Sequence, residues 1–194
     1  MEKLLVTTPI GFIESLSSFG VSFVVFCATT LGTLIIVWSL LYILFRPIPK
    51  YGIFAPFEKL SLRSFHLGLL VVSVLSAKFA SDAFKLYFKI GRPEILNYNF
   101  LPLISLGDFG FPSGHAATFA ALATTLFFIH RRAGIFAGML ALVIGTARIF
   151  AGVHTPLDIL GGYLLGVLVG ILFGFVAEKV RGGFSKATGT QNVA

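Results

Sequence analysis

Five apolar stretches, each close to the length that crosses a lipid bilayer, limit what this chain can fold into. They run over Phe19 to Phe45, Ser64 to Ile90, Ser113 to Ile129, Gly134 to Phe150 and Pro156 to Val180. A helix needs about 20 mostly apolar residues to cross the hydrocarbon core of a membrane. The connections between the stretches are short, which is typical of an antiparallel bundle. The sequence therefore predicts an all-α integral membrane protein with five transmembrane helices.

The composition of the 194 residues excludes a soluble globule and a disordered chain. Hydrophobic residues make up 56% and charged residues only 12%, against the ~25% charged residues of a soluble domain. A globule of this size could not bury so much apolar surface, and disorder requires a more polar chain. The net charge of +7 is explained by basic loops on the cytoplasmic side of a membrane. We therefore expect no nucleic-acid partner.

The two ends of the chain differ from the apolar stretches. In residues 1–18, Thr8-Pro9 is typical of a helix start, and the apolar residues that follow share one helical face. This pattern predicts a short amphipathic helix on the membrane surface. A cleaved signal peptide is less favoured because Pro9 interrupts the short apolar region. We interpret residues 1–180 as one membrane-embedded domain and residues 181–194 as a polar, disordered cytoplasmic tail.

Glycines recur at helical spacing in the last two apolar stretches. The longer ladder consists of Gly162, Gly166, Gly170 and Gly174, and the shorter one of Gly134 and Gly138. Small residues let helix backbones approach closely inside a membrane. We interpret both ladders as packing within one chain. A homodimer is the alternative, which nothing else in the sequence indicates.

Ionisable residues inside the apolar stretches form three clusters. Each such residue costs at least about 2.5 kcal/mol to insert and points to a function. The clusters are the stripe Lys78, Asp82, Lys85 and Lys89 with Arg92 just beyond it, the run Pro112-Ser113-Gly114-His115, and Arg148 with His154 and Asp158. Because the helices alternate in direction, all three clusters fall at the same membrane face. Within the stripe, Lys78 and Asp82 have the spacing of a neutralising pair on one helical face.

Three of the cations have the chemistry of a phosphate site. Lys85, Arg92 and Arg148 can together hold a group of charge about −2 and stabilise charge that develops on its oxygens. The arginine forks match the geometry of phosphate. Ser113 and Gly114 begin a helix, where a hydroxyl and unpaired backbone N–H groups also bind anions. We therefore expect these five residues to bind phosphate.

Two histidines and one aspartate supply the elements of nucleophilic catalysis. Asp158 lies four residues after His154, so it can accept a hydrogen bond from one imidazole nitrogen and leave the other free to attack. It is also expected to raise the pKa of His154. His115 is then available to protonate the leaving oxygen. No pair of carboxylates and no cysteine cluster accompanies these residues, so we expect neither a metal nor another cofactor.

Lysine and arginine counts predict the orientation of the bundle. Nine of them lie on the face of residues 46–63, the turn at residues 131–132 and the C-terminal tail, and five lie on the face of the three clusters. The face richer in positive charge stays in the cytoplasm. We therefore expect a multi-pass protein of the cytoplasmic membrane whose site faces away from the cytoplasm.

The clusters resemble the three motifs of the type 2 phosphatidic acid phosphatase superfamily. KLYFKIGRP, from Lys85 to Pro93, is similar to its Lys-x6-Arg-Pro motif, and FPSGH, from Phe111 to His115, matches its Pro-Ser-Gly-His motif. ARIFAGVHTPLD, from Ala147 to Asp158, matches the Ser-Arg-x5-His-x3-Asp motif except at Ala147. There the usual serine hydroxyl is absent, which removes one contact to phosphate. Soluble haloperoxidases share these motifs, but the five apolar stretches argue against that branch.

The resemblance implies a metal-independent hydrolase that acts on lipid phosphates at the extracytoplasmic face. It implies that His154 is the nucleophile and forms a phosphohistidine, with Asp158 as its orienting group and His115 as the acid. Lys85, Arg92, Ser113, Gly114 and Arg148 would bind the phosphate. The short chain is similar to compact prokaryotic members. The candidate substrates are phosphatidic acid, phosphatidylglycerophosphate and polyprenyl pyrophosphates such as undecaprenyl pyrophosphate.

Two other functions are compatible with the same residues. A lipid phosphotransferase would pass the phosphate from His154 to an acceptor other than water. A membrane protein without enzymatic activity could use the cations to bind anions. The second alternative is less favoured because binding an anion requires neither His154 nor Asp158 nor His115. The expected partners are a lipid phosphate substrate and the surrounding membrane lipids.

Overall fold

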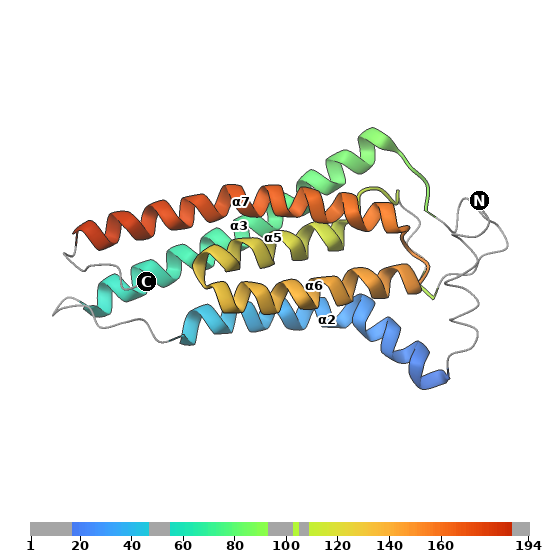
Figure 1. The fold of residues 1–194 in the computed structure, drawn as a ribbon, viewed down its shortest axis with the longest axis horizontal. Coiled ribbons are helices and arrows are strands. Elements are labelled where there is room, and N and C mark those ends of the chain that lie inside the picture. The colour runs from blue at the N-terminus through green and yellow to red at the C-terminus, as the bar shows by residue number, and fades with distance from the viewer. Residues whose placement is uncertain (1–16, 47–54, 93–102, 105–108, 188–194) are drawn as a thin grey trace.

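A computed structural model describes residues 17–46, 55–92, 103–104 and 109–187, which form a bundle of five helices. The helices are α2 (Ser18–Phe45), α3 (Ala55–Phe88), α5 (Gly114–Ile129), α6 (Arg131–Phe150) and α7 (Pro156–Ala187). They run along the long axis of the molecule, and the described residues contain no strand (Figure 1). The predicted all-α membrane bundle is confirmed.

Four of the five helices are long and apolar enough to cross a membrane. Their apolar spans are Ser18–Phe45, Leu60–Phe88, Arg131–Phe150 and Pro156–Val180. Helix α5 is also apolar but has only 16 residues, which is about 24 Å of helix against a hydrocarbon core of about 30 Å. The five predicted helices are therefore present, and length alone supports four as full spans.

Two helix boundaries differ most from prediction, the end of α7 and the start of α3. Helix α7 continues to Ala187, so the segment predicted as a disordered tail from residue 181 begins with seven helical residues. Helix α3 begins at Ala55, nine residues before the predicted start at Ser64. The predicted amphipathic helix at the N-terminus lies outside the described residues, as do residues 188–194.

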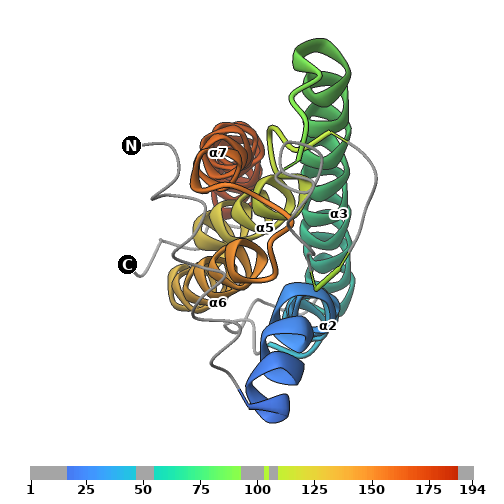
Figure 2. The same ribbon diagram turned by 90° about the vertical axis from the view of Figure 1, so that its right-hand side faces the viewer.

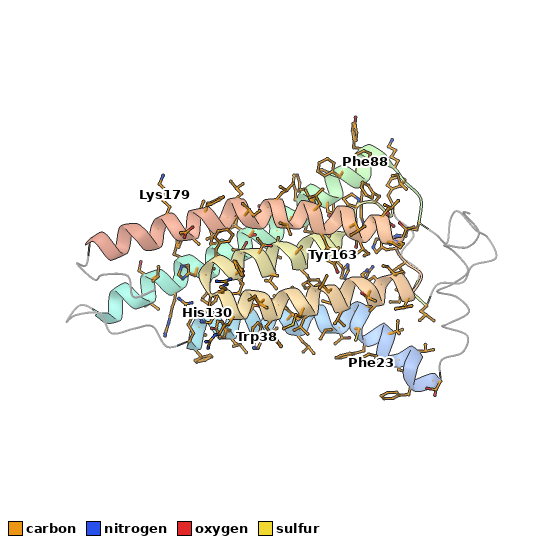
Figure 3. All side chains as sticks on the ribbon, in the orientation of Figure 1. Phe23, Trp38, Phe88, His130, Tyr163 and Lys179 are labelled. Carbon is orange, nitrogen blue, oxygen red and sulfur yellow. The ribbon has the colours of Figure 1, made fainter. Side chains whose placement is uncertain are left out.

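The short helix α5 is the centre of the bundle. Figure 2 shows α5 between α7, α6 and α3. Most of its side chains are buried, and many of them are alanines that allow close neighbours. A hydrogen bond of 2.7 Å between the hydroxyls of Ser73 and Thr125 joins α3 to α5. A second hydrogen bond joins α7 to α6, where the Tyr163 hydroxyl donates to the Ala141 carbonyl at 2.7 Å (Figure 3).

The glycine ladder on α7 packs against α5 of the same chain. A Cβ atom added at Gly162 would lie 2.5 Å from the Ser113 carbonyl oxygen and 2.7 Å from the Ala116 Cβ. The next three glycines of the ladder are equally close to successive turns of α5. The shorter ladder, at Gly134 and Gly138, also faces α5. Both ladders therefore serve packing within one chain, as predicted.

We expect Gly162→Ala to lower the stability of the bundle, because the new methyl group meets backbone that cannot move aside. Overpacking of this kind costs about 1–3 kcal/mol. Gly138→Ala is the matched control, since its methyl group would lie 3.9 Å from the nearest atom and alanine favours helix formation. Thermal unfolding in detergent should give a lower midpoint for Gly162→Ala and an equal or higher one for Gly138→Ala. Equal midpoints for the two variants would contradict the close packing.

Candidate active site

All eight predicted site residues lie at the end of the bundle where α3 ends and α5 and α7 begin (Figure 1). Lys85 is in the last turn of α3 and Arg92 follows that helix; Ser113, Gly114 and His115 begin α5; Arg148 is in the last turn of α6; His154 lies between α6 and α7; and Asp158 is in the first turn of α7. The structure therefore brings the three clusters together. This agrees with the prediction, from the alternating direction of the helices, that they lie at one face.

Backbone hydrogen bonds hold the three segments together. The Ser113 N–H donates to the Asp158 carbonyl at 2.9 Å, which joins the start of α5 to the first turn of α7. The Gly110 N–H donates to the Ile90 carbonyl at 2.8 Å, which joins the segment before α5 to the end of α3. These bonds fix the positions of the motifs without using the side chains of the site.

The start of α5 is shaped for binding an anion. Ser113 is its N-cap, is fully buried, and accepts a hydrogen bond from the Ala116 N–H at 3.5 Å. The Pro112 carbonyl accepts a hydrogen bond from the Ser81 hydroxyl of α3 at 3.2 Å. The first N–H groups of a helix have no acceptor within the helix, and the helix dipole favours negative charge there. Ser113 and Gly114 are thus placed where their predicted role requires.

Backbone carbonyls orient both arginines, which are only 2% exposed. Arg92 Nη1 donates to the Val153 carbonyl at 2.6 Å and lies 3.3 Å from His154 Nε2. Arg148 Nη1 donates to the Ala28 carbonyl of α2 at 3.0 Å. Lys85 is 9% exposed. Arg148 and Arg92 place positive charge around His154, and Lys85 adds positive charge near His115. Together these buried cations give the site a positive charge that suits a dianionic ligand.

The contact with Arg92 determines the tautomer of His154. A guanidinium can only donate hydrogen bonds, so Nε2 accepts and carries no proton. In the neutral imidazole the proton is then on Nδ1, which lies 3.5 Å from Asp158 Oδ2. This separation is longer than an ordinary hydrogen bond, but the arrangement points the lone pair of Nε2 away from Asp158 and toward Arg92. The predicted pairing of these two residues therefore has the right direction.

Burial controls the protonation of His154. It lowers the pKa of this imidazole from 6.5 to about 4, and the positive charges of Arg148 and Arg92 act in the same direction. Asp158 raises the pKa, as expected from the sequence, but desolvation outweighs it. The predicted effect of Asp158 is therefore present, and burial decides the net direction of the shift. His154 is neutral at physiological pH, which is the form that can attack.

This low pKa predicts how stability depends on pH. An unfolded chain protonates His154 below about 6.5, whereas the folded protein does so only near 4. Stability from this residue is therefore complete above pH 6.5 and decreases as the pH falls toward 4, by roughly 3 kcal/mol. We expect the midpoint of thermal unfolding to fall more steeply with acid for the wild type than for His154→Gln. Parallel curves for the two proteins would contradict the low pKa.

Asp158 has a second role that the analysis of the sequence missed. Its Oδ2 accepts a hydrogen bond from the Thr155 N–H at 2.8 Å, and the Thr155 hydroxyl accepts one from the Asp158 N–H at 3.2 Å. Such reciprocal bonds form a capping box at the start of a helix. Pro156 occupies the first helical position, where proline is favoured. The letters Thr-Pro-Leu-Asp contain this signal and could have predicted it.

His115 completes the set from the first turn of α5. Its side chain is half-buried, and the ring lies 6.1 Å from that of Phe119. The positive charges of Arg148, Lys85 and Lys78 interact electrostatically with the His115 ring, and His154 does so too. In the described part of the chain, no three His, Cys, Asp or Glu side chains are grouped as ligands of a metal ion.

Fold and site together define a helical membrane protein with histidines and buried cations gathered at one end of the bundle. The sequence model of the PAP2 superfamily matches residues 66–180, which contain all three motifs. The chain belongs to the PAP2 superfamily.

Curated relatives match part of this chain and part of their own length. Phosphatidylglycerophosphatase B of Bacillus subtilis is 29% identical over 126 residues, which are 59% of this chain and 60% of the relative. An undecaprenyl-diphosphatase of Sulfolobus acidocaldarius is 30% identical over 132 residues, 63% of this chain and 64% of the relative. Less than two thirds of either relative is thus covered.

A solved structure shares the fold over most of the chain. The transmembrane PAP2-type phosphatidylglycerolphosphate phosphatase from Bacillus subtilis superposes with a TM-score of 0.65 at 21% identity. The match covers 92% of this chain and 87% of that structure. It supports the arrangement of the helices.

Proposed function

We propose that this protein is a membrane phosphatase that removes phosphate from a lipid phosphate monoester or diphosphate at the extracytoplasmic face. The observation that carries the proposal is the position of His154, with Nε2 beside Arg92 and Nδ1 toward Asp158. A buried histidine oriented in this way is suited to attack a phosphorus atom. Sites that only bind anions need the cations and not this orientation. The functions named for the two relatives support the same class of substrate.

The proposed reaction has two steps. Lys85, Arg92, Arg148 and the start of α5 hold the phosphate, and the Nε2 lone pair of His154 attacks phosphorus. The bond from phosphorus to the lipid oxygen breaks, and His115 donates a proton to that oxygen. Water then attacks the phosphohistidine as His115 takes up a proton from it. Inorganic phosphate leaves and His154 returns to its starting form.

Arg92 has to change partners during the first step. Its Nη1 contacts the same His154 Nε2 that makes the attack. Phosphate oxygens are stronger acceptors for a guanidinium than an imidazole nitrogen is. Binding of the phosphate therefore releases Nε2 and keeps Arg92 beside the oxygens on which charge develops. The bond from Arg92 to the Val153 carbonyl keeps the guanidinium in place through this exchange.

A phosphate-release assay with the purified full-length protein in detergent tests the proposal. The panel contains phosphatidic acid, phosphatidylglycerophosphate and a polyprenyl diphosphate, each with and without excess EDTA. We expect phosphate release from at least one lipid, undiminished by EDTA, because side-chain cations supply the charge that a metal would provide. No release from any of them, or transfer only to an added acceptor, would overturn the phosphatase assignment. Loss of activity in EDTA that magnesium restores would overturn the metal-independent mechanism.

The proposed face is tested by labelling in intact cells. In a Cys27→Ala background, we expect a cysteine at Asn97 to react with an impermeant thiol reagent. In the sequence, Asn97 falls between the end of α3 and the start of α5, and both of these helix ends lie at the site. A cysteine at Ser185, near the end of α7, should react only after lysis because positive charge keeps that end in the cytoplasm. The reverse pattern would place the site in the cytoplasm.

A further inference from the structure

An ion pair on α3 lies inside a membrane span without being buried in the bundle. Lys78 Nζ donates to Asp82 Oδ2, and the two side chains are 54% and 45% exposed. They belong to the apolar span Leu60–Phe88. Charges at this depth are costly, and apolar residues in place of a desolvated ion pair are often at least as stable. Stability of the fold therefore does not account for the pair.

The pair lies against the start of α5, where the phosphate is expected to bind. A Cβ atom added at Gly114 would be 3.6 Å from Lys78 Cδ and 3.9 Å from its Cε. The same position is 3.5 Å from the Ser81 hydroxyl, which donates to the Pro112 carbonyl. The positive charge of Lys78 also interacts electrostatically with His115. The aliphatic part of Lys78 therefore runs alongside the anion-binding turn.

Lys78 and Lys85 occupy different depths on the same face of α3. They are seven residues apart, which is about 10 Å along the helix. Lys85 is 9% exposed and belongs to the inner site, whereas Lys78 is half exposed and lies further from the site end. Lipid tails extend from the site into the membrane. A substrate whose tail leaves the site along α3 would therefore pass Lys78 on the tail side of its scissile phosphate.

We propose that Lys78 binds a second phosphate group of the lipid substrate, on the tail side of the scissile phosphate. This inference rests on the proposed phosphatase function. Asp82 holds the ammonium group while no substrate is bound, and the second phosphate takes over that contact. A lysine ammonium binds phosphate as a compact charge with three donors. After the exchange, Asp82 stays within reach of Lys85, three residues further along the helix.

The proposal predicts a preference for lipids that carry two phosphates. The second phosphate can be joined directly, as in a polyprenyl diphosphate, or through a glycerol, as in phosphatidylglycerophosphate. Phosphatidic acid has only the scissile phosphate and serves as the reference. Measurements of kcat and KM for the three lipids show which of the two linkages the enzyme prefers, and whether it prefers either of them to phosphatidic acid.

The test compares variants of the two partners in the full-length protein. The measured quantity is the ratio of KM for the preferred two-phosphate lipid to KM for phosphatidic acid. We expect Lys78→Met to raise this ratio about tenfold. Asp82→Asn should change the same ratio in the opposite direction, because it removes the carboxylate that competes for Lys78. Lys78→Arg should keep the ratio of the wild type. The matched control is Lys179→Met, which removes an exposed cation toward the other end of the bundle from Phe88 (Figure 3) and should leave the ratio unchanged.

The sign of the two effects distinguishes this role from a structural one. If the pair only stabilised α3, Lys78→Met and Asp82→Asn would lower the unfolding midpoint and slow the hydrolysis of all three lipids to the same extent. That result would overturn the proposal. Equal KM ratios in the wild type and Lys78→Met would also overturn it. A wild type that hydrolyses none of the lipids would instead refute the proposed function, and this inference with it.

Discussion

His154→Ala should lose at least about 10⁴-fold in kcat while it still folds and still binds phosphate. Removal of a covalent nucleophile costs orders of magnitude because the remaining groups can only orient and polarise the substrate. Binding should persist because Lys85, Arg92 and Arg148 are the proposed phosphate ligands, and carbonyl groups orient both arginines independently of His154. The measurements are phosphate release and competition by inorganic phosphate.

His130→Ala is the matched control for this variant. His130 is the N-cap of α6, with its Nδ1 accepting from the Ala133 N–H at 3.3 Å, and it lies far along the bundle from the site (Figure 3). Its loss should reduce stability by about 1 kcal/mol and leave turnover intact. A His154→Ala enzyme with more than about a tenth of wild-type activity would remove this histidine from the role of nucleophile.

Asp158→Asn should reduce kcat by about 10³–10⁴-fold with little change in stability. The amide keeps the shape of the side chain and an oxygen that can accept from the Thr155 N–H, so the start of α7 remains capped. It no longer favours a proton on Nδ1 of His154, and neutralising an orienting carboxylate has effects of this size in related catalytic arrangements. Kinetics and thermal unfolding of the same preparation measure the two effects.

Thr155→Val separates capping from orientation. It removes the hydroxyl that accepts from the Asp158 N–H and keeps the carboxylate near His154. We expect this variant to lose about 1 kcal/mol of stability and far less activity than Asp158→Asn. If the two variants lost stability and activity in the same proportion, Asp158 would act only through the structure of the helix start.

The bundle and the meeting of the three motifs could be predicted from the sequence because both follow from local rules. Apolar length predicts a helix, and alternation of direction decides which ends share a face. In this way the sequence predicts that Lys85, Ser113 and Asp158 share one end of the molecule, where the structure places them. The glycine ladder was equally predictable because residues at every fourth position share one side of a helix.

The details of the site depend on contacts between distant residues, which no local pattern encodes. The bonds from Arg92 to the Val153 carbonyl and from Arg148 to the Ala28 carbonyl join residues 61 and 120 positions apart. Burial of His154 outweighs the expected effect of Asp158 on its pKa, and this burial depends on the whole bundle. The capping box of Thr155 and Asp158 is local and was available in the sequence.

Trapping of the phosphorylated enzyme tests the central claim most directly. The full-length protein is mixed with a lipid labelled in its scissile phosphate, quenched with alkali during the first turnovers, digested and mapped. We predict the label on the peptide that contains His154, its loss on the timescale of turnover, and no labelled peptide from His154→Ala. Release of phosphate without any labelled enzyme, or a label on another residue, would contradict the account.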